Sequence, residues 1–366
     1  MRERRLYRHL DWGLVAAVLA LCAIGVVMIF SATGDPTRGS LSRLYMTQLS
    51  AIGLGVLVAA AIVLVDYRRL ADSAHVFYVF VLCALLVVLV FGPARGGARR
   101  WIPLGFFNVQ PSEFAKVVLA LVLARFFAEN QRRVPSASDL AIAAGITAVP
   151  FVLIARQPDL GTAFTLAPIL LAIAFLAGMR MRLVLVLAAI ALLTLPVAWR
   201  YALQDYQRSR ISTFLDPAQD PRGAGYQQIQ ARITVGSGGV WGKGFRKGTQ
   251  GQLRFLPVAH NDFIFSVLAE EQGLVGVLVA LGLYLYVLLR SLQAARLAKD
   301  RLGAFLVMGI VAGFGFQVIY NITMSAGLAP VKGLTLPLMS YGGSAMIATL
   351  AGFGVILNVG MRRFTN

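Results

Sequence analysis

The stretch 250–273 places an acidic side chain where a polar loop meets a long apolar run. Asp262 follows Asn261, and the apolar residues begin at Phe263. A carboxylate near lipid is costly unless it faces water or has a function, and an ionised carboxylate can take a proton from a hydroxyl group. Asp262 is therefore the leading candidate for a catalytic base. A helix N-cap explains an Asp at this position about equally well.

Neighbouring residues favour the catalytic interpretation of Asp262. Arg246, Lys247 and Arg254 precede it in the sequence and would keep a nearby carboxylate ionised at neutral pH. Asn261 could also cap the helix, so that the cap does not require Asp262.

A second pair of charged residues lies in a run that starts at Pro111, a typical first residue of a helix. Glu113 and Lys116 are three residues apart and share one face of the expected helix. They either neutralise each other within the membrane or face a cavity and bind substrate.

Glu270 and Glu271 lie about two helical turns beyond Asp262, in an apolar run where adjacent acids are costly. They could hold a cation or brace a neighbouring helix. The glycine-rich segment 237–244 lacks the residue pattern of a nucleotide P-loop. With Lys243 and Arg246 nearby, it could form an anion-binding nest or a simple turn.

The composition places these residues in a membrane. The chain has 366 residues, of which 58% are hydrophobic and 14% charged, which is too apolar for an ordinary soluble protein. We expect an all-α integral membrane protein with about ten transmembrane helices. The apolar runs that could each cross about 30 Å of hydrocarbon are 12–32, 46–65, 73–92, 113–128, 139–156, 160–178, 183–200, 262–290, 302–327 and 341–361.

Most Lys and Arg residues of the short loops fall on the side of the two termini, for example Arg68, Arg69, Arg132 and Arg133. The positive-inside rule therefore places both termini in the cytoplasm. We expect residues 1–366 to form a single polytopic domain, with one large extracytoplasmic loop, about 200–261, before the eighth helix.

The formal net charge is +18, and the large loop contributes to it. Arg210, Lys243 and Arg246 belong to the loop, so its side of the membrane should attract an anion. Nucleic acid is not expected as a partner, since no soluble basic module with stacking aromatics is present. Lipid phosphate or pyrophosphate fits the outer face of a membrane better.

Two other segments are unusual for membrane helices. Residues 330–344 are rich in Gly and Pro, and such backbone is tolerated at membrane depth only where protein or water surrounds it. Residues 157–162 form a polar turn between two apolar runs. A cap by Asp159 on the next helix explains this turn without any function.

Eight ordered sequence blocks resemble those of the SEDS family (shape, elongation, division and sporulation) of bacterial cell-wall synthesis, and the resemblance covers nearly the whole chain. They are RRWIPLG at 99–105, QPSEFAK at 110–116, QPDLGT at 157–162, GAGYQQIQ at 223–230, GSGGVWGKG at 236–244, HNDFIF at 260–265, EEQG at 270–273 and PLMSYGGS at 337–344. Val258 and Asn261 depart from the residues common there, Asn261 standing where Thr is usual, but Asp262 is intact.

The resemblance implies a peptidoglycan glycosyltransferase that polymerises lipid II at the outer face of the cytoplasmic membrane. Asp262 would be its general base. Lys116, Arg210, Arg246 or a divalent cation, Mg or Mn, would stabilise the leaving pyrophosphate. Trp101 would offer a surface for a sugar or lipid, or serve only as an interfacial anchor.

The implied partners are a class B penicillin-binding protein, which supplies transpeptidation, and the elongation machinery. Within the family, the blocks 248–257 and 351–359 are more similar to the elongation members, whereas 332–337 is more similar to the division members. Two rival functions stay open at this point. One is a transporter that flips lipid II, for which no inverted repeat is evident, and the other is a non-catalytic scaffold.

Overall fold

The computed structural model describes residues 9–33, 43–94, 98–103, 108–130, 134–186, 189, 193, 200, 205–220, 223–252, 255–257 and 259–363. Within these residues, seven helices are long and apolar enough to cross a membrane. They are α1 (Trp12–Thr33), α2 (Arg43–Leu64), α4 (Ala74–Phe91), α6 (Ala137–Arg156), α13 (Ile264–Arg296), α14 (Arg301–Ser325) and α15 (Gly343–Arg362). Each corresponds to one of the ten predicted spans, and the all-α membrane fold is confirmed.

The other three predicted spans differ from a simple apolar helix. α5 (Pro111–Glu129) has the expected length and begins at the predicted proline, but it carries charged residues along its course. The run 160–178 is divided into α7 (Leu160–Phe164) and α8 (Leu166–Leu176), which meet at Thr165. The run 183–200 lies largely outside the described residues.

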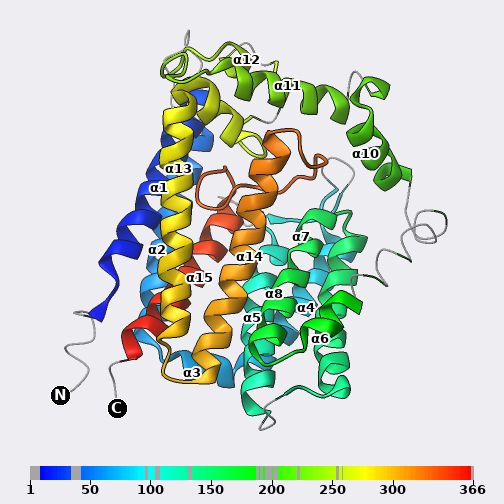
Figure 1. The fold of residues 1–366 in the computed structure, drawn as a ribbon, viewed down its shortest axis with the longest axis vertical. Helices are drawn as coiled ribbons and strands as arrows, with labels where there is room; N and C mark the ends of the chain where they lie inside the picture. The colour runs from blue at the N-terminus through cyan, green and yellow to red at the C-terminus, as the bar shows by residue number, and fades with distance from the viewer. Residues whose placement is uncertain are drawn as a thin grey trace.

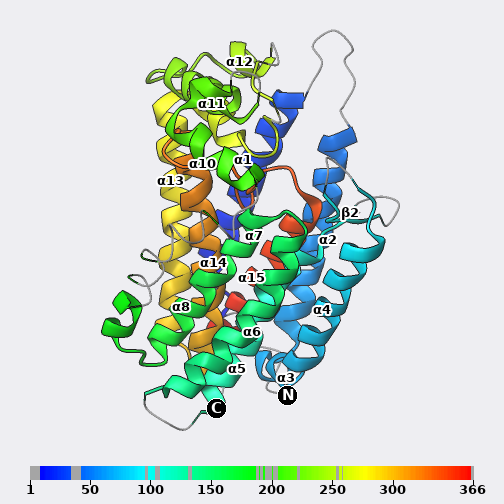
Figure 2. The same cartoon turned by 90° about the vertical axis from the view of Figure 1, so that its right-hand side faces the viewer.

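Different structural elements lie at the two ends of the molecule. The start of α1 and the end of α15 lie at one end of the bundle, as predicted from the placement of the two termini on the same side, and the short α3 (Tyr67–Asp72) lies near them (Figure 1). At the opposite end lie α10 (Asp205–Leu215), α11 (Ala224–Ser237) and α12 (Thr249–Gln252), with the 3-10 turn η2 (Pro217–Gln219) between α10 and α11 (Figure 2). The described residues of the large loop are therefore largely helical. A small antiparallel pair, β1 (Ile102–Pro103) and β2 (Asn108–Val109), precedes α5.

α14 and α15 form the centre of the bundle and are the most deeply buried of the spanning helices. Small residues let the backbone approach closely around them. A Cβ at Gly354 of α15 would lie 2.9 Å from the Cα of Ala59 in α2. A Cβ at Gly25, in the middle of α1, would lie 2.5 Å from the Cα of Met339.

That contact places the non-helical segment 330–342 inside the bundle, between α14 and α15. Leu334, Leu336 and Met339 are almost fully buried. Protein therefore surrounds the irregular backbone, which is the condition under which such backbone is tolerated at membrane depth.

α13 is interrupted at Gly273, which has φ +63° inside an otherwise helical run. A Cβ there would lie 2.3 Å from the backbone nitrogen of Gly242. The glycine-rich segment 238–244 fills the break, and its N–H groups at Lys243 and Gly244 donate to the carbonyls of Glu270 and Glu271 at 2.9 and 3.0 Å. These N–H groups are occupied by backbone acceptors, so the segment braces the kink of α13 rather than forming an anion nest.

Candidate active site

A cavity of about 550 Å³ lies beneath the outer loop, where α5, the turn 157–162, the start of α13 and the segment 333–345 meet. Five of the matched sequence blocks, 99–105, 110–116, 157–162, 260–265 and 337–344, therefore come together at one place. The side chains with chemical groups that line it include Arg100, Trp101, Gln110, Glu113, Asp159, Asn261, Asp262, Tyr341 and Ser344.

Asp262 faces this cavity and does not cap the following helix. α13 begins at Ile264 with Phe263 as its N-cap residue, and no side chain makes a capping hydrogen bond there. The N-cap interpretation of Asp262 is therefore wrong, and Asn261 does not cap the helix either. The side-chain oxygen of Asn261 is buried without a hydrogen-bond partner. The Asp262 carboxylate lies close to Gly333 in the opposite wall of the cavity, where a Cβ would be 3.6 Å from Oδ2 of Asp262.

The environment of Asp262 tunes its basicity. Burial raises the pKa of its carboxyl to about 6, while the positive charges of Arg210 and Arg100 act against the rise and the negative charge of Asp159 adds to it. At neutral pH the carboxylate is mostly ionised, and it is a stronger base than an exposed aspartate. The shift comes from burial, and the cations that oppose it are not the three expected from the sequence.

Arg246, Lys247 and Arg254 were expected to lie near Asp262, and the described ones do not line its cavity. The Arg246 guanidinium lies 5.3 Å from the ring centre of Phe30 in α1. Arg254 is outside the described residues.

Asp159 is a second carboxylate of the cavity, and sequence reasoning assigned it only a structural role. The predicted cap is present, because Oδ1 accepts from the Thr162 N–H at 3.3 Å. Its Oδ2 accepts from the side-chain amide of Gln110 at 2.9 Å. Burial raises the pKa of Asp159 as well. Its place in a block of the family pattern was the signal that could have pointed to the site.

Arg100 is the arginine that lines the cavity, and sequence reasoning did not single it out. It donates from Nε to the carbonyl of Gln157 at 3.0 Å and also to the carbonyl of Pro158. These bonds fix the guanidinium against the turn 157–162. Trp101, which follows it, lines the same cavity, as a sugar-facing surface requires.

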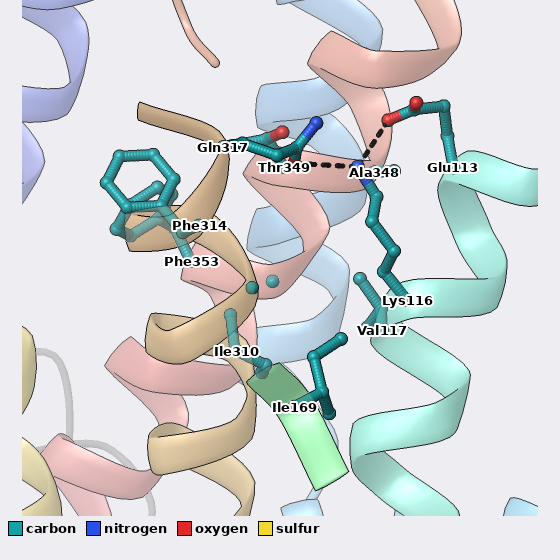
Figure 3. A pocket seen from close by; sticks show the side chains of 12 residues that line it. Glu113, Lys116, Val117, Ile169, Ile310, Phe314, Gln317, Ala348, Thr349 and Phe353 are labelled. Atoms are coloured by element: carbon teal, nitrogen blue, oxygen red, sulfur yellow. Dashed lines mark hydrogen bonds and ion pairs between the residues drawn. The ribbon is translucent and has the colours of Figure 1, made fainter. Parts of the chain in front are cut away.

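Glu113 and Lys116 form a buried ion pair with 2.7 Å between Nζ and Oε2 (Figure 3). Lys116 also donates to Oε1 of Gln317 in α14 at 2.8 Å. Glu113 lines both the Asp262 cavity and a smaller, mainly apolar cavity of about 40 Å³ beneath it, whereas Lys116 lines only the smaller one. The two expected roles, mutual neutralisation and facing a cavity, are therefore both present. Glu113 faces the larger cavity, and Lys116 neutralises the Glu113 carboxylate from the side of the smaller one.

Glu270 and Glu271 brace other segments, one of the two roles expected for them. Glu270 is fully buried and accepts from Lys243 Nζ at 2.8 Å and from the N–H groups of Thr249 and Gln250 at 2.8 and 3.0 Å. Glu271 accepts from the Ser31 hydroxyl at 2.5 Å. Lys243 is therefore held in an ion pair away from the Asp262 cavity.

Arg210 does not line the Asp262 cavity, although its charge acts on the Asp262 carboxyl. Among the residues that the structure describes, no group of three or more His, Cys, Asp or Glu could enclose a metal ion.

Comparison with known proteins identifies the family of this chain. The model of the FtsW, RodA and SpoVE family, described as cell cycle proteins, matches residues 12–364. The peptidoglycan glycosyltransferase MrdB of Escherichia coli is 40% identical over 97% of this chain and 94% of its own length. A probable peptidoglycan glycosyltransferase FtsW of Geobacter metallireducens is 38% identical over 96% of this chain and 95% of its own.

Solved structures share the fold. A chain from a peptidoglycan synthase complex, described for its coordination of polymerization and crosslinking, superposes with a TM-score of 0.84 and 38% identity, covering 98% of this chain and 99% of that one. The rod shape determining protein RodA of Thermus thermophilus gives a TM-score of 0.72 and 35% identity, with 98% of each chain covered. The chain belongs to the FtsW, RodA and SpoVE family of multi-pass membrane proteins, the SEDS family.

Proposed function

We propose that this chain is a peptidoglycan glycosyltransferase that polymerises lipid II at the outer face of the cytoplasmic membrane during cell elongation. The observation that carries the proposal is the Asp262 carboxylate, which does not cap α13 and instead lines a cavity of about 550 Å³ together with Arg100 and Trp101. The printed activity of the MrdB and RodA relatives supports the same assignment.

In the proposed reaction, Asp262 removes the proton from the 4-hydroxyl of the acceptor GlcNAc. The hydroxyl oxygen forms a bond to C1 of the donor MurNAc, and the bond from C1 to the lipid pyrophosphate breaks with its electron pair on the departing oxygen. The proton leaves Asp262 to water afterwards. A positioned base of this kind contributes about 10²–10⁴-fold to the rate.

The leaving pyrophosphate requires positive charge, and Arg100 is the arginine in the cavity wall. Lys116 acts through Glu113, which it neutralises, while Arg210 adds positive potential at Asp262. The cavity acids fit a Mg or Mn ion that arrives with the pyrophosphate, since such ions are usually held by one or two carboxylates and substrate phosphates. Asp159 is the residue that would hold it, and the ion would withdraw charge from the leaving group.

The proposed partner is a class B penicillin-binding protein that crosslinks the strands, within the elongation machinery. The support is the similarity to a chain of a synthase complex that coordinates polymerization with crosslinking. The positive charge near the termini supports a cytoplasmic placement for both of them.

The test is glycan-strand formation from lipid II by the purified protein in detergent, copurified with a class B partner whose transpeptidase site is blocked. Asp262→Asn keeps the size of the side chain and removes the base, so polymer should fall by about 10²–10⁴-fold. Asp216→Asn is the matched control, because Asp216 is an exposed aspartate of the outer loop that caps η2.

Equal polymer from the native chain and Asp262→Asn would contradict the assignment of Asp262. Polymer from neither, in an assay where a known polymerase works, would contradict the enzymatic function. A lipid flippase needs a sealed bilayer with two leaflets, so activity in detergent separates it from a polymerase.

A further inference from the structure

Lys332 is a cation next to the Asp262 cavity that has no role in the site described above. It precedes Gly333, which lines the cavity, but Lys332 itself does not line it. Its Nζ lies 4.5 Å from the ring centre of Phe164 in α7 and 5.6 Å from that of Tyr320 in α14. Lys332 therefore lies between α7 and α14, just outside the cavity wall.

The ammonium group of Lys332 is available to an anion. Its side chain is only partly buried, and within the described part of the chain no carboxylate or other hydrogen-bond acceptor is bonded to its Nζ. The two ring faces attract the charge but leave the three N–H donors without lone-pair acceptors. The positive charge of Arg210 also acts on Lys332. An anion beside Lys332 would accept its hydrogen bonds and relieve this repulsion.

Apolar side chains continue from Lys332 toward the middle of the membrane. Phe164 is exposed, and so is Ile319, which precedes Tyr320 on α14. Phe316 lies one turn deeper on the same face of α14 as Tyr320, with 5.9 Å between the two ring centres. In a bilayer such exposed surface is covered by hydrocarbon. Phe164, Tyr320 and Phe316, the aromatic track, can therefore carry an apolar chain whose anionic end lies at Lys332.

A polyprenyl pyrophosphate combines an anion with a long apolar chain, and the reaction proposed above uses two such molecules. In the donor, the pyrophosphate is bonded to C1, the atom that is attacked, so it must lie within the cavity, where Arg100 is. In the acceptor, two sugar rings separate the pyrophosphate from the 4-hydroxyl that approaches Asp262. The acceptor pyrophosphate therefore belongs outside the cavity, as Lys332 does.

We propose that Lys332 binds the pyrophosphate of the acceptor, whose polyprenyl chain lies along the aromatic track and whose disaccharide enters the cavity past Gly333. The assignment to the acceptor rests on the function proposed above. A glycerophospholipid also offers a phosphate and apolar chains, but a pyrophosphate carries more negative charge and gains more from the positive charge at Lys332. Inorganic pyrophosphate leaves the aromatic track without an occupant.

The test is native mass spectrometry of the full chain in detergent, titrated with undecaprenyl pyrophosphate, which has no sugar to transfer and reports binding without catalysis. Two molecules should bind, and Lys332→Gln should weaken one of them about fivefold, as expected for the loss of one basic residue beside a lipid phosphate. Lys332→Arg keeps the charge and should keep the affinity. Lys247→Gln is the control, because Lys247 is an exposed lysine of the outer loop that does not line the cavity.

Other ligands separate the contributions of charge and chain. Undecaprenol should bind more weakly and should not respond to Lys332→Gln, phosphatidylglycerol should also bind more weakly, and inorganic pyrophosphate should not remain bound. Phe316→Ala should weaken undecaprenol and undecaprenyl pyrophosphate alike, whereas Phe80→Ala, at an exposed phenylalanine of α4, should weaken neither. Undecaprenyl pyrophosphate binding that is unchanged in Lys332→Gln, or no stronger than that of phosphatidylglycerol, would overturn the proposal.

Lipid II kinetics separate this proposal from the function on which it rests. Lys332→Gln should raise KM for lipid II about fivefold and leave kcat nearly unchanged, because the lysine holds the acceptor away from the reacting atoms. An unchanged KM would overturn the assignment to the acceptor, although the chain would still be a polymerase. If the native chain forms no polymer but Lys332→Gln weakens undecaprenyl pyrophosphate, the proposed function fails and the pyrophosphate site at Lys332 stands.

Discussion

The side-chain amide of Asn321 donates to the backbone carbonyl of Asp262 at 2.9 Å and to that of Leu334 at 2.7 Å. Asn321 belongs to α14 and is fully buried. One side chain in a central helix thus holds both the residue that carries the proposed base and the segment 330–342 across the cavity. The backbone of Asp262 is therefore held by a side chain of α14 and not by a capping bond to α13, the helix that follows it.

Replacing Asn321 by Leu should therefore damage the site from a distance. The substitution keeps a similar size but leaves two buried carbonyls without donors, each at a cost of about 1–3 kcal/mol. We expect a lower melting temperature and slower glycan polymerisation, with lipid II binding less affected. Thr323→Val on the same helix is the control, because the Thr323 hydroxyl bonds only to carbonyls of its own helix. Unchanged polymerisation by a folded Asn321→Leu protein would contradict this role.

The raised pKa of Asp262 predicts the pH profile of the reaction. A base must be ionised to accept a proton, so the rate should fall as the pH drops through about 6 and the carboxyl becomes protonated. Polymerisation at subsaturating lipid II, measured between about pH 5 and about pH 8, checks this.

The neighbours of Asp262 give the sign of two further shifts in that profile. Arg210→Gln removes a positive charge and should move the midpoint to higher pH. Asp159→Asn removes a negative charge and should move it to lower pH in whatever activity remains. A rate that is flat across the range, or shifts of the opposite sign, would exclude Asp262 as the titrating base.

Variants of the pair Glu113 and Lys116 allow its effect on stability to be measured separately from its effect on activity. Lys116→Met leaves a buried carboxylate without its partner, at a cost of about 3–5 kcal/mol. Adding Glu113→Gln removes the uncompensated charge, so the double variant should regain most of the lost thermal stability. Polymer formation should stay low, because Glu113 also lines the Asp262 cavity. Full activity in the double variant would mean that the pair is only structural.

Gly273 and Gly282 form a matched pair within α13. Gly273→Ala places a Cβ at φ +63° and 2.3 Å from the backbone of Gly242, so a loss of at least about 1–2 kcal/mol is expected. Gly282 has open space around it, and Gly282→Ala should leave stability unchanged or raise it by up to about 1 kcal/mol. Thermal unfolding in detergent measures both, and equal effects would contradict the proposed role of the break.

Strong local signals made much of the fold predictable. Long apolar runs specify helices such as α1 and α14, and Pro111 marks the start of α5. The break at Gly273 was not foreseen, because a single glycine in an apolar run is also compatible with a continuous helix. Its cause lies in segment 238–244, whose contact with α13 depends on tertiary structure.

The candidate site was predictable at Asp262 and less so around it. Asp262 and Trp101 line one cavity, but Lys243 and Arg246 do not line it, since Glu270 and Phe30 hold them elsewhere. Residues near each other in sequence need not share a cavity. Arg100 and Asp159 lie far from Asp262 along the chain, and only folding brings them together.

The contact of Met339 with Gly25 has a consequence for competing hydrolysis. Gly25 stands roughly two turns before the end of α1 at Thr33, about 12 Å along the helix axis. Met339, which lies between the two cavity-lining stretches 333–335 and 341–345, is thus well below the outer end of α1. We expect little bulk water at such a depth, so that a sugar hydroxyl delivered by a lipid-anchored chain should meet the donor carbon in preference to water. Depth would then favour strand growth over wasteful cleavage of the precursor.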